Sequence, residues 1–165
     1  MEEKIKFYVQ ERDHRAEILS ILRGNDSDGN IKEQLLEYHE HDIANAFEEL
    51  TDDERERLTG ILGSEIMSEI VSHLDDAGDY LSALDAEDAA EIIEQMDADD
   101  ALEALDDLDE ETRSEIFDRI EDAEIREDIA LLDSYEDTEF GSRMSTNFIA
   151  VKRSFTVKET MKALV

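Results

Sequence analysis

The sequence predicts an all-α solenoid of short stacked helices, followed by a shorter segment of different composition. Three observations lead to this prediction. The chain has no proline and only six glycines, large apolar residues recur every twelve residues, and other apolar residues within each repeat follow helical spacing. Without proline, the breaks between elements must come from capping residues and polar turns, which favours many short helices.

The repeat is defined by large apolar anchor residues in two frames of period twelve, joined by one ten-residue step. The anchors are Tyr38, Leu50, Leu62, Leu74, Leu84, Met96, Leu108, Ile120 and Leu132. The eighth and ninth positions after an anchor are mostly apolar, and the fifth often is, which gives a helical stripe. Each unit therefore predicts one helix of about nine residues and a tight turn, too short to be stable alone. Stacked units would bury a continuous apolar seam.

Polar residues mark where these helices are expected to begin. Thr51 and Glu54 have the spacing of a capping box. Asp85, Asp97 and Asp109 stand at N-cap positions, where a carboxylate oxygen accepts hydrogen bonds from first-turn amides. Acidic first turns also suit the positive end of the helix dipole.

Composition divides the chain into four regions. We expect a helix from Phe7 to Leu22 and a polar linker within residues 1–30, the helical superhelix at 31–133, a junction at 134–142, and the incomplete start of a second domain at 143–165. In this last region five Lys and Arg face one acid. Residues 147–151 predict a short strand and residues 156–165 an amphipathic helix, which together cannot close a core.

Acidic residues outnumber basic ones by 48 to 16, for a net charge of -32, while 40% of the residues are apolar. The chain is therefore predicted to fold, and a nucleic-acid partner is excluded because phosphate requires Lys and Arg facing it. Residues 58–112 contain 19 Asp and Glu and no Lys or Arg. Their mutual repulsion predicts that compactness depends on salt, metal ions or a basic partner. Adaptation to high salt is an alternative explanation of the charge.

Other site patterns are rejected. Asp26 to Asn30 resembles the start of an EF-hand loop, but Ile31 takes the place of its glycine, so a polar linker is preferred. His39 and His41 point to different helix faces and no cysteine is present, so zinc is not expected. No catalytic constellation or phosphate loop is found, and an enzyme is not predicted. With no signal peptide and no membrane-span-length apolar run, the chain as given is expected to be soluble and intracellular.

Three segments together resemble the cytosolic part of the MgtE family of magnesium channels. They are LLEYHEHDIANAFEEL at 35–50, MDADDALEAL at 96–105, and YEDTEFGSRMSTNFIAV at 135–151 followed by TVKE. In that family a right-handed α-superhelix, the N domain, precedes a pair of CBS motifs, a plug helix and a transmembrane pore. The resemblance implies that residues 31–133 are the superhelix and residues 143–165 a truncated α/β CBS fragment, the start of the first CBS motif.

The resemblance also implies a function. Magnesium ions between the acidic N domain and the CBS domains would hold the assembly compact and the pore shut when magnesium is high. The implied partners are Mg²⁺, the CBS and pore domains of the same chain, and a second copy in a homodimer, on the cytoplasmic side of the cell membrane. Independently, Mg²⁺ keeps several waters and takes one or two carboxylates, which an acidic surface supplies.

Four residues are the candidate metal ligands. Asp99 and Glu103 lie four apart on one predicted helical face, where like charges repel unless a cation lies between them. Both are similar to family positions that contribute to magnesium sites facing the CBS domain, as is Glu69. Asp100 is adjacent but projects differently. The ordinary alternative is that these acids are solvated carboxylates or helix caps.

A second function remains open at this point. A soluble solenoid and CBS pair, with no pore, would use an acidic superhelix as a scaffold or regulatory surface for a partner protein. Several apolar spans after the CBS pair would distinguish a channel from such a scaffold.

Overall fold

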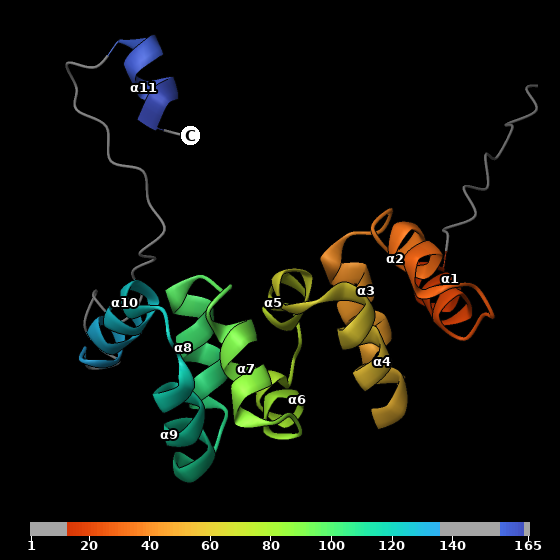
Figure 1. Cartoon of the computed structure of the whole chain (residues 1–165), viewed down its shortest axis with the longest axis horizontal. Coiled ribbons are helices and arrows are strands. Elements are labelled where there is room, and N and C mark those ends of the chain that lie inside the picture. The colour runs from red at the N-terminus through yellow and green to blue at the C-terminus, as the bar shows by residue number, and fades with distance from the viewer. Residues whose placement is uncertain (1–12, 136–155, 164–165) are drawn as a thin grey trace, which may run out of the picture. The chain divides into compact units, whose positions relative to one another are not determined.

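A computed structural model describes residues 13–135 and 156–163 of the chain (Figure 1). These residues are all-helical, as the sequence predicts. The predicted strand at 147–151 and the first part of the predicted Phe7–Leu22 helix lie outside the described residues. No helix among the described residues is both long enough and apolar enough to cross a membrane.

The helices are short and follow one another closely. They are α1 (His14–Leu22), α2 (Asp28–Leu35), α3 (Glu40–Phe47), α4 (Asp52–Leu62), α5 (Ser64–Val71), α6 (Ala77–Ser82), α7 (Ala86–Ile93), α8 (Ala98–Asp106), α9 (Glu110–Arg119), α10 (Ala123–Asp133) and α11 (Val157–Ala163). From α3 to α10, each repeat unit contains one helix, as predicted. The ten-residue step from Leu74 to Leu84 contains α6, which has six residues.

The helical stripe predicted within each unit forms the core. Residues at the eighth and ninth positions after an anchor are almost all buried: Ala46, Phe47, Leu58, Ile70, Val71, Ile92, Ile93, Ala104, Leu105 and Ile116. At the fifth position, Ile43, Met67, Ala89 and Ala101 are also buried. The anchors lie mostly between helices, and five of the nine are buried: Leu50, Leu62, Met96, Ile120 and Leu132. The apolar pattern therefore determines which face of each short helix turns inward.

Contacts divide the chain into two compact units, residues 1–74 and 75–165. In the first unit α1 packs on α2 and α3, α2 on α4, α3 on α5, and α4 on α5. In the second unit α6 packs on α7 and α8, α7 on α9, and α8 on α10. Helices thus contact the next helix but one within each unit. The boundary coincides with the start of the shortened repeat, where the two frames of period twelve meet.

The chain before the repeat belongs to the first unit. The sequence predicts a polar linker near Asp26 to Asn30, but α2 already begins at Asp28, because the Ser27 hydroxyl accepts a hydrogen bond from the Asn30 amide at 3.4 Å. Buried Ile31 and Leu35 on α2 explain why this segment is helical. The helix start was not predicted because the residues of its first turn are polar and resemble a loop.

Basic side chains bind the ends of neighbouring helices in the first unit. Lys32 Nζ donates to the Leu62 carbonyl at the end of α4 at 2.8 Å, and Arg57 Nη1 donates to the Leu22 carbonyl at the end of α1 at 2.8 Å. These side chains satisfy C-terminal carbonyls that have no partner inside their own helix.

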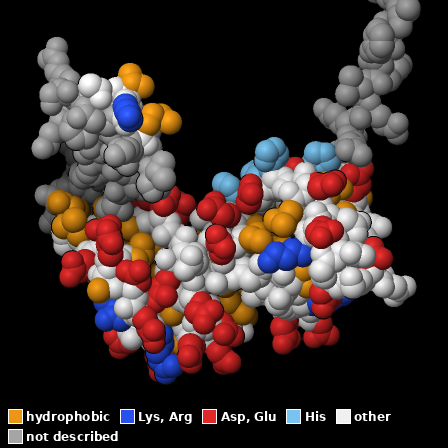
Figure 2. Space-filling model, turned by 45° about the horizontal axis from the view of Figure 1, so that its top comes forward, with side chains coloured by type: hydrophobic (Ala, Val, Ile, Leu, Met, Phe, Trp, Pro, Cys, Tyr) orange, Lys and Arg blue, Asp and Glu red, His pale blue; other side chains and the backbone are white. Residues whose placement is uncertain are grey.

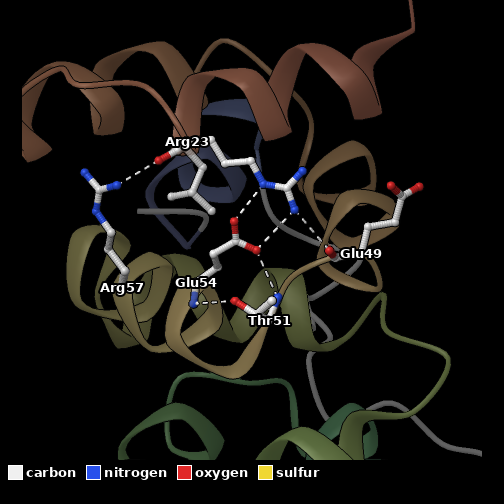
Figure 3. Close-up of polar contacts among 6 residues, drawn as sticks. Arg23, Glu49, Thr51, Glu54 and Arg57 are labelled. Atoms are coloured by element: carbon white, nitrogen blue, oxygen red, sulfur yellow. Dashed lines mark hydrogen bonds and ion pairs between the residues drawn. The ribbon is translucent and has the colours of Figure 1, made fainter.

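A polar network links the end of α1 to the start of α4 (Figure 3). The Thr51 and Glu54 capping box is present as predicted, and Arg23 Nε donates to Glu54 Oε1 at 2.7 Å. Arg23 also donates to the Glu49 carbonyl at 3.3 Å. The hydrogen bond from Arg23, together with that from the Thr51 backbone amide, lowers the pKa of Glu54 to about 2.

Two glycines allow neighbouring helices to join or pack closely. Gly63 has φ of +83° and serves both as the C-cap of α4 and as the residue before α5, a conformation that glycine adopts without a Cβ penalty. In the second unit a Cβ on Gly78 would lie 2.7 Å from Asp107 Cβ and 2.8 Å from the Asp107 carbonyl oxygen. Glycine at position 78 therefore allows α6 to approach the end of α8.

Candidate metal-binding surface

Acidic side chains are scattered over the face seen in Figure 2 and outnumber the basic ones there. Several cations outside the 58–112 stretch are engaged by specific partners. Arg15 pairs with Glu49 at 3.1 Å, and Arg113 joins Asp106 at 3.0 Å and Asp133 at 2.8 Å. Because residues 58–112 contain no Lys or Arg, any Lys or Arg that pairs with their carboxylates, as Arg113 does with Asp106, lies outside this stretch.

The predicted pair Asp99 and Glu103 lies on α8, four residues apart and hence on one face. Glu103 is exposed and Asp99 half-buried. Asp100, also half-buried, is next along the helix and is turned by about 100° from Asp99. The structure thus brings Asp99 and Glu103 together, with Asp100 beside them on the same helix.

Asp99 has an unusual environment for a carboxylate. Its Oδ1 atom is buried and has no hydrogen-bond partner. Two other buried atoms in the described residues share this property, Nε of Arg55 and Nε of Arg126. Both belong to guanidinium groups with other contacts: Arg55 lies over the Phe47 ring at 5.0 Å, and Arg126 Nη2 donates to the Ile120 carbonyl.

A buried carboxylate oxygen without a hydrogen-bond partner requires a physical explanation. A buried acceptor without a partner carries a desolvation cost of about 1–3 kcal/mol, more for a charged group. Such atoms in native proteins often mark a bound ion or water. The position of Asp99 in the first turn of α8 contributes favourable interaction with the helix dipole, but it leaves this oxygen without a partner. Asp99 is therefore the candidate ligand that the geometry supports best.

A surface cavity of about 280 Å³ borders the beginning of α8. Four carboxylates from α10 and the turns before α8 and α10 line it, with no Lys or Arg among the lining residues: Asp97, Asp122, Glu124 and Asp128. Asp122 is already engaged, because its Oδ1 accepts from the Glu124 amide at 2.8 Å and from the Ile125 amide at 3.3 Å. Sequence reasoning missed this cavity, although the twelve-residue register places both turns in equivalent positions.

The carboxylates do not form a closed metal cage. Among residues 13–135 and 156–163, no group of three or more His, Cys, Asp or Glu side chains has the arrangement of a metal site. Such a surface suits a hydrated Mg²⁺ that keeps most of its waters and contacts one or two carboxylates.

Glu69 is exposed on α5. It belongs to the first compact unit, whereas Asp99, Asp100 and Glu103 belong to the second. The four predicted residues therefore do not form one cluster within either unit.

The three predicted N-cap residues differ in whether their side chains make capping hydrogen bonds. Asp85, Asp97 and Asp109 all occupy N-cap positions as predicted, but the side chains of Asp85 and Asp97 make no capping hydrogen bond. Asp109 Oδ1 accepts from the Glu111 and Thr112 amides at 3.1 Å each. Hydrogen bonds from the Thr112 hydroxyl and amide lower the pKa of Asp109.

The rejected motifs have other contacts. Asp26 accepts from Gln34 Nε2 at 3.1 Å, and Asp28 pairs with Arg57 at 3.2 Å. His39 is the N-cap of α3, where it makes no capping bond. His41, however, meets the His73 ring, a contact between residues 32 positions apart that the sequence did not reveal.

Comparison with known proteins gives two matches. The family model described as "MgtE intracellular N domain" matches residues 38–138. Among solved structures, the "Crystal structure of the soluble part of a magnesium transporter" is similar with a TM-score of 0.82 and 23% sequence identity. That alignment covers 92% of this chain and 60% of the other, so this chain spans less than two thirds of its length. No curated protein matches the chain.

Proposed function

The chain belongs to the family of MgtE intracellular N domains, and from this premise we propose that it is the magnesium-sensing cytosolic domain of a magnesium channel or transporter. In this proposal Mg²⁺ bridges the acidic N-domain surface and CBS domains, and so favours a closed pore. The observation that carries the proposal is the buried, unpartnered Oδ1 of Asp99, one helical turn from exposed Glu103.

Charge explains why ion binding would act as a switch. Carboxylates without internal counter-charges repel one another, and this repulsion opposes compact packing. An ion that binds the compact state more tightly than the open state shifts the population toward it, in proportion to its differential affinity. At an ion concentration ten times Kd, this stabilisation is about 1.4 kcal/mol.

The wider architecture follows from the same proposal. The contacts between next-but-one helices within each unit are consistent with stacked helices of an α-superhelix, and its right-handed sense is what the family resemblance implies. Residues 143–165 would be the start of the first CBS motif, and α11 its first helix. The pore domain would follow in the full-length protein, which we expect to be a homodimer. Glu69 and Asp100 remain proposed secondary contacts for Mg²⁺.

The test is thermal unfolding of this chain against Mg²⁺ at constant ionic strength, with Na⁺ and K⁺ as controls. Two double variants remove equal charge: Asp99→Asn with Glu103→Gln on α8, and Glu115→Gln with Asp118→Asn on exposed positions of α9. Both are expected to reduce general repulsion. Only the α8 pair is expected to lose most of the Mg²⁺-dependent rise in Tm, because only it converts the Asp99 carboxylate, whose Oδ1 has no partner, to a neutral amide.

Two outcomes would reject the proposal. If Na⁺ or K⁺ raises Tm as much as Mg²⁺ at matched ionic strength, the acidity reflects general screening. If the α8 and α9 variants lose the Mg²⁺ response equally, the ions form a diffuse atmosphere and Asp99 is a solvated carboxylate.

A further inference from the structure

We propose that His41 and His73 form a two-imidazole site for a divalent transition-metal ion, distinct from the proposed magnesium contacts in its nitrogen ligands. His41 lies in the first turn of α3 and His73 directly after the C-cap of α5, and these two helices pack together in the first unit. Their ring centroids are 5.9 Å apart at an interplanar angle of 70°. Both side chains are exposed, and histidine side chains are visible at the surface in Figure 2.

The ring separation lies within the reach of one ion. With metal-to-nitrogen bonds of about 2.0–2.1 Å, two imidazoles on one ion have ring centroids roughly 5–6.5 Å apart. The observed 5.9 Å lies inside this range. Because the rings are edge to face, the side chains must rotate for both nitrogens to face the ion, a motion of picoseconds to nanoseconds for exposed residues.

Asn45 positions the first ring. Its side-chain nitrogen lies 3.0 Å from His41 Nδ1 and 2.8 Å from the His41 carbonyl oxygen. The amide nitrogen donates to both atoms, so in the unbound site Nδ1 accepts and the ring proton lies on Nε2. A metal on Nε2 requires that proton to move to Nδ1, so the Asn45 amide must release Nδ1 while it keeps its hydrogen bond to the His41 carbonyl.

The chemistry of the pair selects a different ion from the acidic surface. Imidazole binds Cu²⁺, Ni²⁺ and Zn²⁺ well, whereas Mg²⁺ prefers oxygen ligands. The neighbouring Asp42 is engaged with His14 Nδ1 at 2.8 Å. The site thus supplies two protein ligands, and water completes the coordination. A bound ion would tie α3 to the end of α5 and stabilise the first unit.

The test is a calorimetric titration of the chain with Ni²⁺ and with Zn²⁺ in a saturating Mg²⁺ background, which occupies the carboxylates. His41→Gln and His73→Gln are each expected to weaken binding by more than about tenfold. Asn45→Ala is expected to keep or raise the affinity, because metal binding breaks the Asn45 hydrogen bond to Nδ1. His39→Gln is the matched control, an exposed histidine two residues from His41. It is expected to leave the affinity unchanged.

A second measurement needs no variant. Bound Ni²⁺ is expected to protect His41 and His73, but not His39, from acylation by diethyl pyrocarbonate. Unchanged affinity in His41→Gln and His73→Gln would overturn the proposal. Equal loss in His39→Gln, or equal protection of all three histidines, would also overturn it and indicate adventitious binding only.

Discussion

Gly78→Ala is expected to destabilise the second unit, because α6 approaches the C-cap of α8 too closely for a side chain. The added Cβ would lie 2.7 Å from Asp107 Cβ, 2.8 Å from its carbonyl oxygen and 2.9 Å from its carbonyl carbon. Two of these three atoms belong to the backbone, so rotation of the Asp107 side chain cannot relieve the overlap. One helix must move by several tenths of an ångström.

The magnitude follows from two opposing effects. Overpacking of this kind costs about 1–3 kcal/mol. Replacing glycine with alanine restores about 0.4–1 kcal/mol through the unfolded chain. The net loss of unfolding free energy is therefore about 1–2 kcal/mol, or a fall in Tm of roughly 2–8 °C.

Gly60→Ala is the control, because Gly60 lies inside α4 with nothing within 4 Å of its added Cβ. It is expected to raise stability by about 0.5–1 kcal/mol. Urea and thermal unfolding at fixed Mg²⁺ and salt would give the stabilities, and hydrogen exchange would locate the change at α6 and α8. A Gly78→Ala variant as stable as Gly60→Ala would refute the inferred close packing of α6 on α8.

The remaining predictions concern caps, pH and the N-terminal helices. Asp109→Ala is expected to lower the free energy of unfolding, measured in urea, by about 1 kcal/mol. Asp85→Ala is expected to lower it clearly less, because of these two side chains only that of Asp109 makes capping hydrogen bonds. Equal decreases in the two variants would contradict this prediction. Since the pKa of Glu54 is lowered from 4.5 to about 2, its stabilising contribution is present above pH 4.5 and lost as pH falls toward 2. Glu54→Gln should therefore reduce the slope of stability against pH in that interval, and an unchanged slope would disprove the assignment. Deletion of residues 1–37 should reduce the helical circular dichroism signal by more than the share of residues removed and should lower the Tm, because buried side chains on α1 and α2 pack on the helices that remain. A deletion variant that melts cooperatively at an unchanged Tm would contradict this expectation.

The repeat was predictable from sequence because burial imposes a regular spacing on apolar residues. One helix per unit from α3 to α10 is confirmed, and so are the inward-facing positions such as Ile70 and Leu105. The all-α class is confirmed for the described residues, and the family is confirmed as well. These features depend on local pattern, which a single sequence contains.

Features that depend on contacts between distant residues were not predictable in the same way. The helix start at Asp28 was missed because its polar first turn resembles a loop. Asp99 was chosen from spacing and resemblance, but the burial of its Oδ1 depends on how the surrounding side chains pack. His41 and His73 were likewise not paired, because only the packing of α3 on α5 brings them together. Glu69, Asp99, Asp100 and Glu103 remain predicted magnesium contacts.

In the first unit, Lys and Arg side chains that donate to the last carbonyls of neighbouring helices should make these helices unfold cooperatively. Lys32 on α2 closes the end of α4, and Arg57 on α4 closes the end of α1. If one of these three helices unfolds locally, it breaks a part-buried hydrogen bond to another of them. The amides of the three helices are therefore expected to exchange with solvent together, as one foldon. The matched family segment begins at residue 38, after α1 and α2. The cooperative unit that contains α4 is therefore expected to extend upstream of the segment by which the family is identified.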